Sequence, residues 1–306
     1  MLTFSKLSKT PFSFQRMTGV TVEQFEKIAV MIRPLWDEAE RARLSRPDRQ
    51  RAIGAGAKYH LPTLNDKLLV LFMYYRTYIT MEFLGFLFDI HKSNISRVIE
   101  KLEKLMKKTA TLLGDKPKRD RSQRKRINNL EDFMKKYPEM KGMIVDATEQ
   151  ETQRPQRGQK AYYSGKKKRH TMKNQIIINE KGEIIDTTDS HPGAKHDKKV
   201  FDESPFVKSL PKNIGMDGDS GYQGMNDDFP HARTPFKKKR GGPALNKIQK
   251  RFNHSLSRIR VLVENVIRRV KIFKILSYRY RGNRKKHGNI FKSISFITNM
   301  KFGFSG

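Results

Sequence analysis

Residues 213–224, NIGMDGDSGYQG, decide the fold because they end a short apolar run with two aspartates inside a glycine-rich turn. The run predicts a buried strand, and glycine lets the backbone bend sharply directly after it. Asp217 and Asp219 therefore stand at or just past a strand end, where carboxylate oxygens suit a hard cation such as Mg²⁺. Turn formation is the commoner use of Asp beside Gly, so this stretch alone leaves both interpretations open.

Two further acids lie in patterns that point to the same place. Residues 141–148, KGMIVDAT, predict a buried strand that ends with Asp146 and the residues just after it. Glu264 is the sole acid in a long helix predicted from about residue 246 to about residue 276, whose apolar residues form one core-facing stripe. A mixed α/β sheet covered by helices would bring these acids together with the Asp217 and Asp219 turn.

The chemistry that such a set supports is metal-dependent cleavage of a phosphodiester. Two Mg²⁺ ions about 4 Å apart need carboxylates that flank and bridge them, and Asp146 and Glu264, together with the Asp217 and Asp219 turn, would supply those. Each has an ordinary alternative. An isolated Asp after a strand often caps a turn, and Glu264 can form weak ion pairs with Arg260 and Arg268 one turn away.

Composition narrows the class of partner. The chain has 64 Lys and Arg against 31 Asp and Glu, a formal net charge of +33, so its surface attracts polyanions and nucleic acid is the first candidate. With no cysteine, any metal must bind oxygen or imidazole. The longest apolar run, residues 68–75, is too short to span a membrane, and residues 1–17 show no secretory signal. We therefore expect action in the cytoplasm.

The N-terminal third predicts helices and a DNA-binding motif. Residues 1–20 show no clear periodicity, whereas residues 21–43 and 61–80 have helical patterns, the second with Thr63 or Asn65 as cap. Residues 80–106 then have helix-turn-helix spacing, with a turn at about residues 90–92 and Ser93 as the cap of the second helix. The residues predicted to contact bases or phosphates are Lys92, Ser93, Asn94, Ser96 and Arg97. An ordinary helical hairpin is the alternative, and the net charge favours DNA.

Three segments follow from these patterns. Residues 1–115 are expected to form a helical DNA-binding domain, and residues 116–139 begin with the basic run KPKRDRSQRKR and read as a linker that lies along phosphates. Residues 140–306 contain the predicted strands, including an antiparallel hairpin over residues 174–190, and the long helix. We expect this last segment to carry the carboxylates.

Five segments in this order resemble the DDE transposases of bacterial insertion sequences, in the branch that is also similar to eukaryotic Harbinger-type nucleases. The segments are KGMIVDATE, YYSGKKKRHTMK, PGAKHDKKVF, DGDSGYQG and NHSLSRIRVLVENVIRRVKIFKIL. They cover most of residues 141–276, and residues from 54 through the helix-turn-helix resemble the DNA-binding module that precedes the nuclease in this branch. The resemblance implies an α/β ribonuclease-H-like mixed sheet with flanking helices, preceded by an all-α helix-turn-helix domain.

The resemblance also implies roles for single residues. The catalytic and metal-binding acids would be Asp146, Asp219 and Glu264, with Asp219 preferred to Asp217 because it precedes Ser-Gly-Tyr. Arg260 and Lys271 complete the family's pattern around Glu264 and would hold DNA phosphate. Ser257 stands where many relatives have Tyr, which puts one DNA contact in doubt. The supporting residues implied around the metals are His196, Asp197 and Asp217.

The function implied is that of a transposase that binds the terminal inverted repeats of its own element, cleaves DNA and transfers strands with Mg²⁺ or Mn²⁺, using two ions. Pairing of two DNA ends implies a homodimer or a larger assembly, acting on the bacterial nucleoid and not on a membrane. The first alternative is a sequence-specific DNA-binding protein derived from a transposase whose nuclease domain is inactive. A basic RNA-binding protein is the second, and it leaves the three acids in matching contexts unexplained.

Overall fold

The computed structural model describes residues 1–45, 59–115, 130–238 and 241–304, which belong to two compact units. The first unit is Met1–Ala110 together with Lys271–Tyr278, and the second is Thr111–Val270 with Arg279–Gly306. Residues 116–129 of the predicted linker lie outside the described residues. The expected domain boundaries at residues 115 and 140 stay a prediction.

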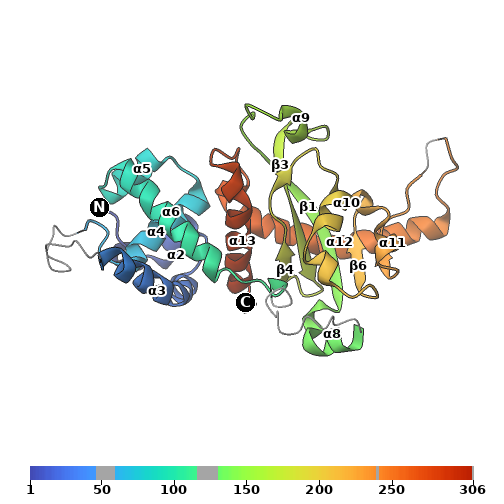
Figure 1. Ribbon diagram of the computed structural model, residues 1–306, viewed down its shortest axis with the longest axis horizontal. Coiled ribbons are helices and arrows are strands. Elements are labelled where there is room, and N and C mark those ends of the chain that lie inside the picture. Colours follow the sequence, from blue (N-terminus) through green and yellow to red (C-terminus); the bar gives the residue numbers. More distant parts are fainter. Residues whose placement is uncertain (46–58, 116–129, 239–240, 305–306) are drawn as a thin grey trace. The chain divides into compact units, whose positions relative to one another are not determined.

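The first unit is helical throughout its described residues (Figure 1). Its elements are α1 (Phe4–Leu7), α2 (Pro11–Thr18), α3 (Val22–Leu44), α4 (Leu64–Thr77), α5 (Met81–Phe88), α6 (Lys92–Thr109) and the 3₁₀ turn η5 (Lys274–Leu276). Helices α1 and α2 form where the sequence shows no period, because two short helices contribute few buried residues each. The predicted helices α3 and α4 both begin with capping boxes, at Thr21 and at Thr63.

The helix-turn-helix forms at the predicted place. Helix α5 ends at Phe88, and α6 begins at Lys92. Gly85 lets the turn fold back on α5, because a Cβ there would lie 2.6 Å from the Ile90 carbonyl oxygen. The prediction that Ser93 caps α6 is wrong, since His91 is the N-cap and its ring Nδ1 accepts the backbone N–H of Ser93 at 3.3 Å.

The second unit is built on a seven-stranded mixed sheet with the order β2-β3-β1-β6-β7, while β4 and β5 also pair with β3. The strands are β1 (Gly142–Glu151), β2 (Tyr163–Ser164), β3 (Arg169–Asn179), β4 (Ile184–Thr187), β5 (His191–Pro192), β6 (Gly215–Gly218) and β7 (Ala232–Arg233). Strand β1 runs antiparallel to β3 and parallel to β6. The predicted β3–β4 hairpin is confirmed, and β1 continues past the predicted end at residue 148.

Helical segments cover both faces of this sheet (Figure 1). They are α8 (Leu130–Lys136), η2 (Pro138–Met140), α9 (Gln159–Tyr162), α10 (Asp197–Glu203), η3 (Val207–Ser209), η4 (Ser220–Tyr222), α11 (Met225–Asp228), α12 (Lys247–Lys271) and α13 (Arg284–Lys301). Helix α12 ends earlier than predicted, and its residues Leu262 and Val266 lie close to Gly182 in the β3–β4 turn. Together, sheet and helices confirm the predicted fold class and are consistent with a ribonuclease-H-like fold.

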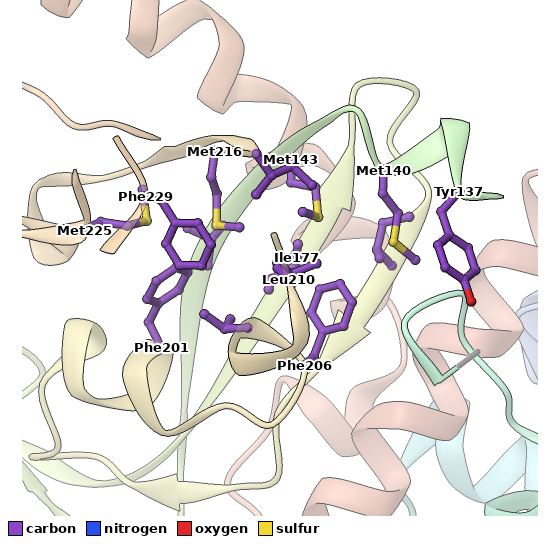
Figure 2. Packing of buried hydrophobic residues seen from close by; sticks show 14 of the residues in the cluster. Tyr137, Met140, Met143, Ile177, Phe201, Phe206, Leu210, Met216, Met225 and Phe229 are labelled. Carbon is purple, nitrogen blue, oxygen red and sulfur yellow. The ribbon is translucent and has the colours of Figure 1, made fainter. Parts of the chain in front are cut away.

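The main core of the second unit lies on the face opposite α12. Met143 and Val145 of β1 and Met216 of β6 pack there with the rings of Phe201 and Phe206. Figure 2 shows these side chains meeting between the strands and the helical segments that follow them. Burial of one such side chain contributes about 1.5–3 kcal/mol, so this face fixes the strands that carry the acids. No helix in the described ranges is both long and apolar enough to cross a membrane.

Candidate active site

Strand register brings the first two acids together. Val145 of β1 is paired in parallel with Gly218 of β6, so the next residues along each strand, Asp146 and Asp219, are neighbours. Parallel strands lie about 4.8 Å apart. Asp146 is therefore not at the end of β1, as the sequence suggested, but at the point where β6 stops pairing with it.

Asp146 is electrostatically perturbed. Its pKa is raised to about 6, mainly by burial. The backbone N–H of Ala147 donates to its Oδ1 at 2.8 Å and has the opposite, smaller effect on this pKa. The charges of Asp219 and Asp197 raise the pKa further, whereas the guanidinium of Arg260 lowers it. A carboxylate that ionises reluctantly among other carboxylates is stabilised in its charged form by a nearby cation.

Asp219 and Asp197 meet at Gly221. The Oδ1 of Asp219 accepts the Gly221 backbone N–H at 2.6 Å, which fixes this carboxylate in the turn after β6. A Cβ on residue 221 would lie 2.7 Å from Asp197 Oδ2 and 2.9 Å from Asp219 Oδ1. Glycine is required here because two carboxylates approach the backbone closely.

Lys173 of β3 neutralises part of this charge. Its side chain is 8% exposed, and its ammonium lies 2.7 Å from Asp197 Oδ1 and 3.7 Å from Glu149 Oε1. It also donates to the carbonyl oxygen of Lys195 at 2.6 Å. Lys173 and Glu149 were not predicted as site residues, although Lys173 ends the quoted motif YYSGKKKRHTMK and Glu149 follows Asp146 on the same strand.

Tyr222 lies close enough to Asp146, Asp197 and Asp219 for their charges to act on its hydroxyl. Burial raises the pKa of its phenol, and the charges of Asp146, Asp197 and Asp219 raise it further. Its buried hydroxyl has no hydrogen-bond partner among the described residues. The quoted motif DGDSGYQG contains this tyrosine, but local pattern does not predict that its hydroxyl lies near three carboxylates.

Glu264 reaches the cluster through Arg260. The two residues lie one turn apart on α12, with Arg260 Nη2 3.9 Å from Glu264 Oε1, and the Glu264 side chain is 46% exposed. Arg260 is also close enough to Asp146 to lower its pKa. Within the described residues, no three His, Asp or Glu side chains converge closely enough to hold a metal ion. The structure thus brings Asp146 and Asp219 together and leaves Glu264 paired with an arginine at the edge of the site.

The other predicted supporting residues lie in different places. Asp217 is buried and forms an ion pair with the half-exposed Arg233, with its two oxygens 2.6 and 2.7 Å from Nε and Nη2 of that residue. His196 is the exposed N-cap residue of α10, directly before Asp197. Lys271 is the last residue of α12. Asp217 therefore stabilises the β6–β7 pair, and Arg233, its partner, was missed by the sequence analysis.

The residues predicted to contact DNA begin α6 in the first unit. Asn94 and Arg97 are exposed and bonded to each other, with Arg97 Nη1 donating to Asn94 Oδ1 at 2.9 Å. Lys92 pairs with Glu82 of α5 at 2.9 Å, and Ser93 bonds to the ring of His91 at 2.8 Å. Ser96 is partly buried on the same helix. The first turns of α6 thus present an amide and a guanidinium to solvent.

Comparisons with known proteins agree with both units. The model of the DDE superfamily endonuclease matches residues 145–299, and the model of the helix-turn-helix of the DDE superfamily endonuclease matches residues 59–111. A Microchaete diplosiphon protein named "Probable transposase for insertion sequence element IS702" is 29% identical over 282 residues, which is 91% of this chain and 90% of that protein. A Streptomyces albus G protein with the same kind of name, for insertion sequence element IS112, is 26% identical over 90% of this chain and 89% of its own length. No solved structure matches.

Proposed function

Because this chain belongs to the DDE superfamily of endonucleases, and its relatives are named as transposases, we propose that it moves an insertion element by cutting DNA at the element's ends and joining those ends to a target. The helical unit recognises the terminal inverted repeats through α6, and the sheet unit performs cleavage and strand transfer. Its place of action is then the bacterial nucleoid, in the cytoplasm.

The proposed metal ligands are Asp146, Asp219 and Glu264. The donor set fits a hard divalent cation, Mg²⁺ or Mn²⁺, because it consists of carboxylate oxygens and because the pKa of Asp146 is raised by burial and by Asp219. A bound pair of such ions would supply the charge that activates a water or a 3′-hydroxyl and stabilises the departing oxygen. Glu264 joins this set by releasing Arg260, its present partner.

The remaining residues hold and orient these groups. Lys173 pairs with Asp197 and Glu149, and in this proposal it keeps both acids in place near Asp146 and Asp219. Arg260 offers a guanidinium to a DNA phosphate once Glu264 turns away from it. Lys271, seven residues after Glu264 on α12, would hold a phosphate farther along the strand.

The observation that carries this proposal is the parallel register that makes Asp146 and Asp219 neighbours, within a chain that matches the endonuclease family over the same residues. The test is cleavage of a supercoiled plasmid carrying both ends of the source element, with Mg²⁺ or Mn²⁺. Asp219→Asn and Glu264→Gln should bind the ends and lose at least about a hundredfold in cutting, since each removes several kcal/mol of charge stabilisation.

Asp202→Asn is the matched control, because Asp202 is an acid of α10 that accepts a hydrogen bond from Lys198 at 2.6 Å and does not belong to the carboxylate cluster. It should cut like the unaltered chain. Cutting that survives both site substitutions would remove the carboxylate assignment. A chain that binds the ends specifically and never cuts would instead be the DNA-binding protein with an inactive nuclease, which the Arg260–Glu264 pair in this structure also fits.

We also propose that two or more copies act together, because two ends must be held at once for strand transfer. Chemical crosslinking on paired end DNA should trap dimers or larger assemblies. Recovery of monomers alone on DNA that is being cut would contradict this part of the proposal.

A further inference from the structure

The helical unit contains a cavity of about 570 Å³ that none of the predicted functions uses. It lies between α3, the residues that lead into α4, and the exposed side of α6. Trp36, Lys67 and Lys101 line it from three different helices. Cavities of this size are typical of sites that take a small ligand or a part of a larger one.

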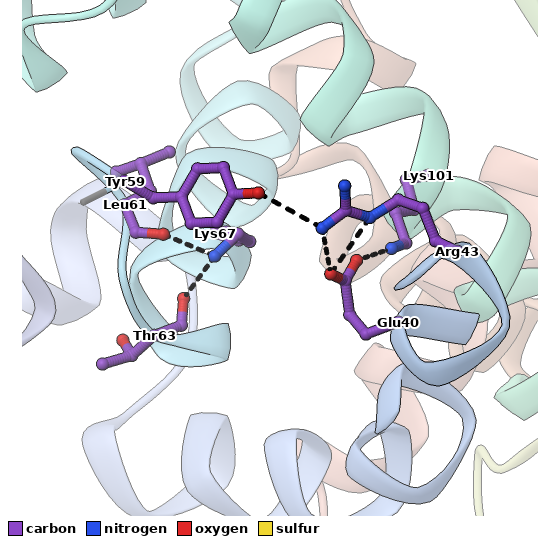
Figure 3. Close-up of polar contacts among 7 residues, drawn as sticks. All are labelled: Glu40, Arg43, Tyr59, Leu61, Thr63, Lys67 and Lys101. Carbon is purple, nitrogen blue, oxygen red and sulfur yellow. Dashed lines mark hydrogen bonds and ion pairs between the residues drawn. The ribbon is translucent and has the colours of Figure 1, made fainter. Parts of the chain in front are cut away.

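Two ammonium groups are held over the same indole. Lys101 Nζ lies 4.1 Å and Lys67 Nζ 5.3 Å from the ring centroid of Trp36. A tryptophan face attracts cations, and here one ring has two ammonium groups within cation–π distance. Lys67 also donates to the carbonyl oxygens of Leu61 and Thr63, as Figure 3 shows.

A third cation, Arg43, shares one internal anion with Lys101. Arg43 Nη2 lies 2.8 Å from Glu40 Oε2, and Lys101 pairs with Glu40 Oε1 (Figure 3). Glu40 is the one acid among the described residues that line the cavity, whereas Arg43, Lys67, Arg97 and Lys101 are all cationic. The cavity therefore has excess positive charge. Burial lowers the pKa of Lys67, which indicates that its ammonium has lost part of its hydration.

The cavity opens beside the first turns of α6. Asn94 and Arg97, which are exposed and predicted to touch DNA, also line it. A duplex that contacted Asn94 and Arg97 would therefore lie against residues that line the cavity. A phosphate is the anion that matches several cations lining one cavity.

We propose that this cavity is a phosphate-binding site for the DNA strand that lies on α6, in which Arg43, Lys67 and Lys101 hold a backbone phosphodiester. Trp36 is a positioning residue, because both ammonium groups lie within cation–π distance of its ring. Glu40 is the internal counter-ion that the phosphate replaces. The inference rests on the proposed function, since it requires that α6 binds DNA, and it adds contacts from α3 and α4 that the helix-turn-helix motif does not imply.

Trp36 makes the site directly observable because it is the only tryptophan of the chain. Its emission should change and saturate when a duplex containing the element's end is titrated into the full-length protein. Inorganic phosphate and a mononucleotide are titrated in parallel. A response to the duplex alone supports the DNA strand as the ligand, while saturation by inorganic phosphate alone, with no response to duplex, would overturn it.

Charge-neutral variants separate this site from general attraction to DNA. Lys67→Gln and Lys101→Gln should each weaken binding of the end duplex about tenfold, because each removes a charged hydrogen bond to phosphate, and should reduce the salt dependence of binding by up to about one ion. Lys27→Gln is the matched control, since Lys27 is an exposed residue of α3 paired with Glu23. It removes the same charge and should change little.

Glu40→Gln should change the affinity for the end duplex in the opposite direction. It removes the internal anion, so Arg43 and Lys101 are released and binding should become tighter. If the unaltered chain binds the end duplex and all four variants bind equally with the same salt dependence, the cavity is not a phosphate site although the proposed function stands. If the unaltered chain does not bind the end duplex, both proposals fail.

Discussion

The two units of this chain each gather like charges in a partly buried place, and they differ in what balances those charges. In the sheet unit, Asp146, Asp219 and Asp197 are opposed by Lys173 and Arg260, which come from a strand and from α12. In the helical unit, Lys67 and Lys101 are opposed by one carboxylate and by the face of an indole. The first place has carboxylates to offer a cation, and the second has cations to offer a phosphate.

The difference teaches how each site is prepared for its ligand. A carboxylate whose pKa is raised by burial and by its neighbours stores unfavourable energy that a cation relieves. The cations that line the cavity have one acid among them, Glu40, so in our proposal Glu40 is the carboxylate that a phosphate would displace. The carboxylate cluster should therefore limit the stability of the sheet unit, whereas the cation cavity should limit DNA affinity.

The largest expected effect on stability comes from the cation that balances the carboxylates. Lys173→Met should lower the free energy of unfolding by about 3 kcal/mol, because it leaves Asp197 and Glu149 partly buried without their shared partner. Denaturant unfolding of the full chain measures this. Lys199→Met, at an exposed position of the helix that carries Asp197, should cost less than about 0.5 kcal/mol. Equal losses in both variants would show that Lys173 does not balance the cluster.

The next substitution, Asp146→Asn, should raise the free energy of unfolding, because it removes a carboxylate whose charged form is unfavourable in the folded chain. The folded-state pKa of Asp146 is about 6, above its usual value, so the folded chain binds this proton more tightly than the unfolded chain does. The contribution of Asp146 to stability is therefore present at low pH and is lost as pH rises from about 4 to about 6. Asp146→Asn should be more stable than the unaltered chain by about 2 kcal/mol at pH 8, and the difference should shrink towards pH 4.5.

Thermal unfolding of both proteins over this pH range, with and without Mg²⁺, measures the effect. Mg²⁺ should raise the melting temperature of the unaltered chain at pH 8 and that of Asp146→Asn much less, because the ion binds only the folded carboxylates. If Asp146→Asn is instead less stable than the unaltered chain at pH 8, the folded chain stabilises the charged form of Asp146, and this prediction is wrong.

The part of this arrangement that the sequence predicts is set by local pattern. Apolar runs predicted β1, β3, β6 and α12, and the turn chemistry around Gly221 placed Asp219 next to a strand end. The neighbours across the sheet were not predictable in this way. Lys173 lies 24 residues after Glu149 and 24 residues before Asp197, and it meets Glu149 because the register of β1 and β3 pairs these two residues. Local pattern cannot specify which strands pair, so the partners of the acids appear only in the folded chain.

The same limit explains the wrong or missing details. Ser93 is a good capping residue by type, but His91 occupies the capping position because the turn after α5 ends two residues earlier. The cavity at Trp36 joins α3, α4 and α6, whose sequences show three separate amphipathic helices. The four cations among its described lining residues are spread over residues 43–101 and form no motif. A cluster assembled by tertiary packing leaves no periodic signal.

The smallest effect separates two aspartates that are two residues apart. Asp217 is buried and bonded to Arg233 through both oxygens, whereas Asp219 lies among other carboxylates. Asp217→Asn should lower the free energy of unfolding by about 1 kcal/mol, because it weakens a charge-assisted pair whose arginine stays half exposed and remains hydrated.

Asp219→Asn should leave stability unchanged or slightly raised, since the amide oxygen can still accept the Gly221 N–H while repulsion with Asp146 is removed. Denaturant unfolding of the two variants, combined with their cleavage rates, then gives a crossed result: Asp217→Asn loses stability and Asp219→Asn loses cutting. The same loss of stability in both variants would mean that residue 219 is a structural turn former, and the carboxylate cluster would be reduced to Asp146 and Asp197.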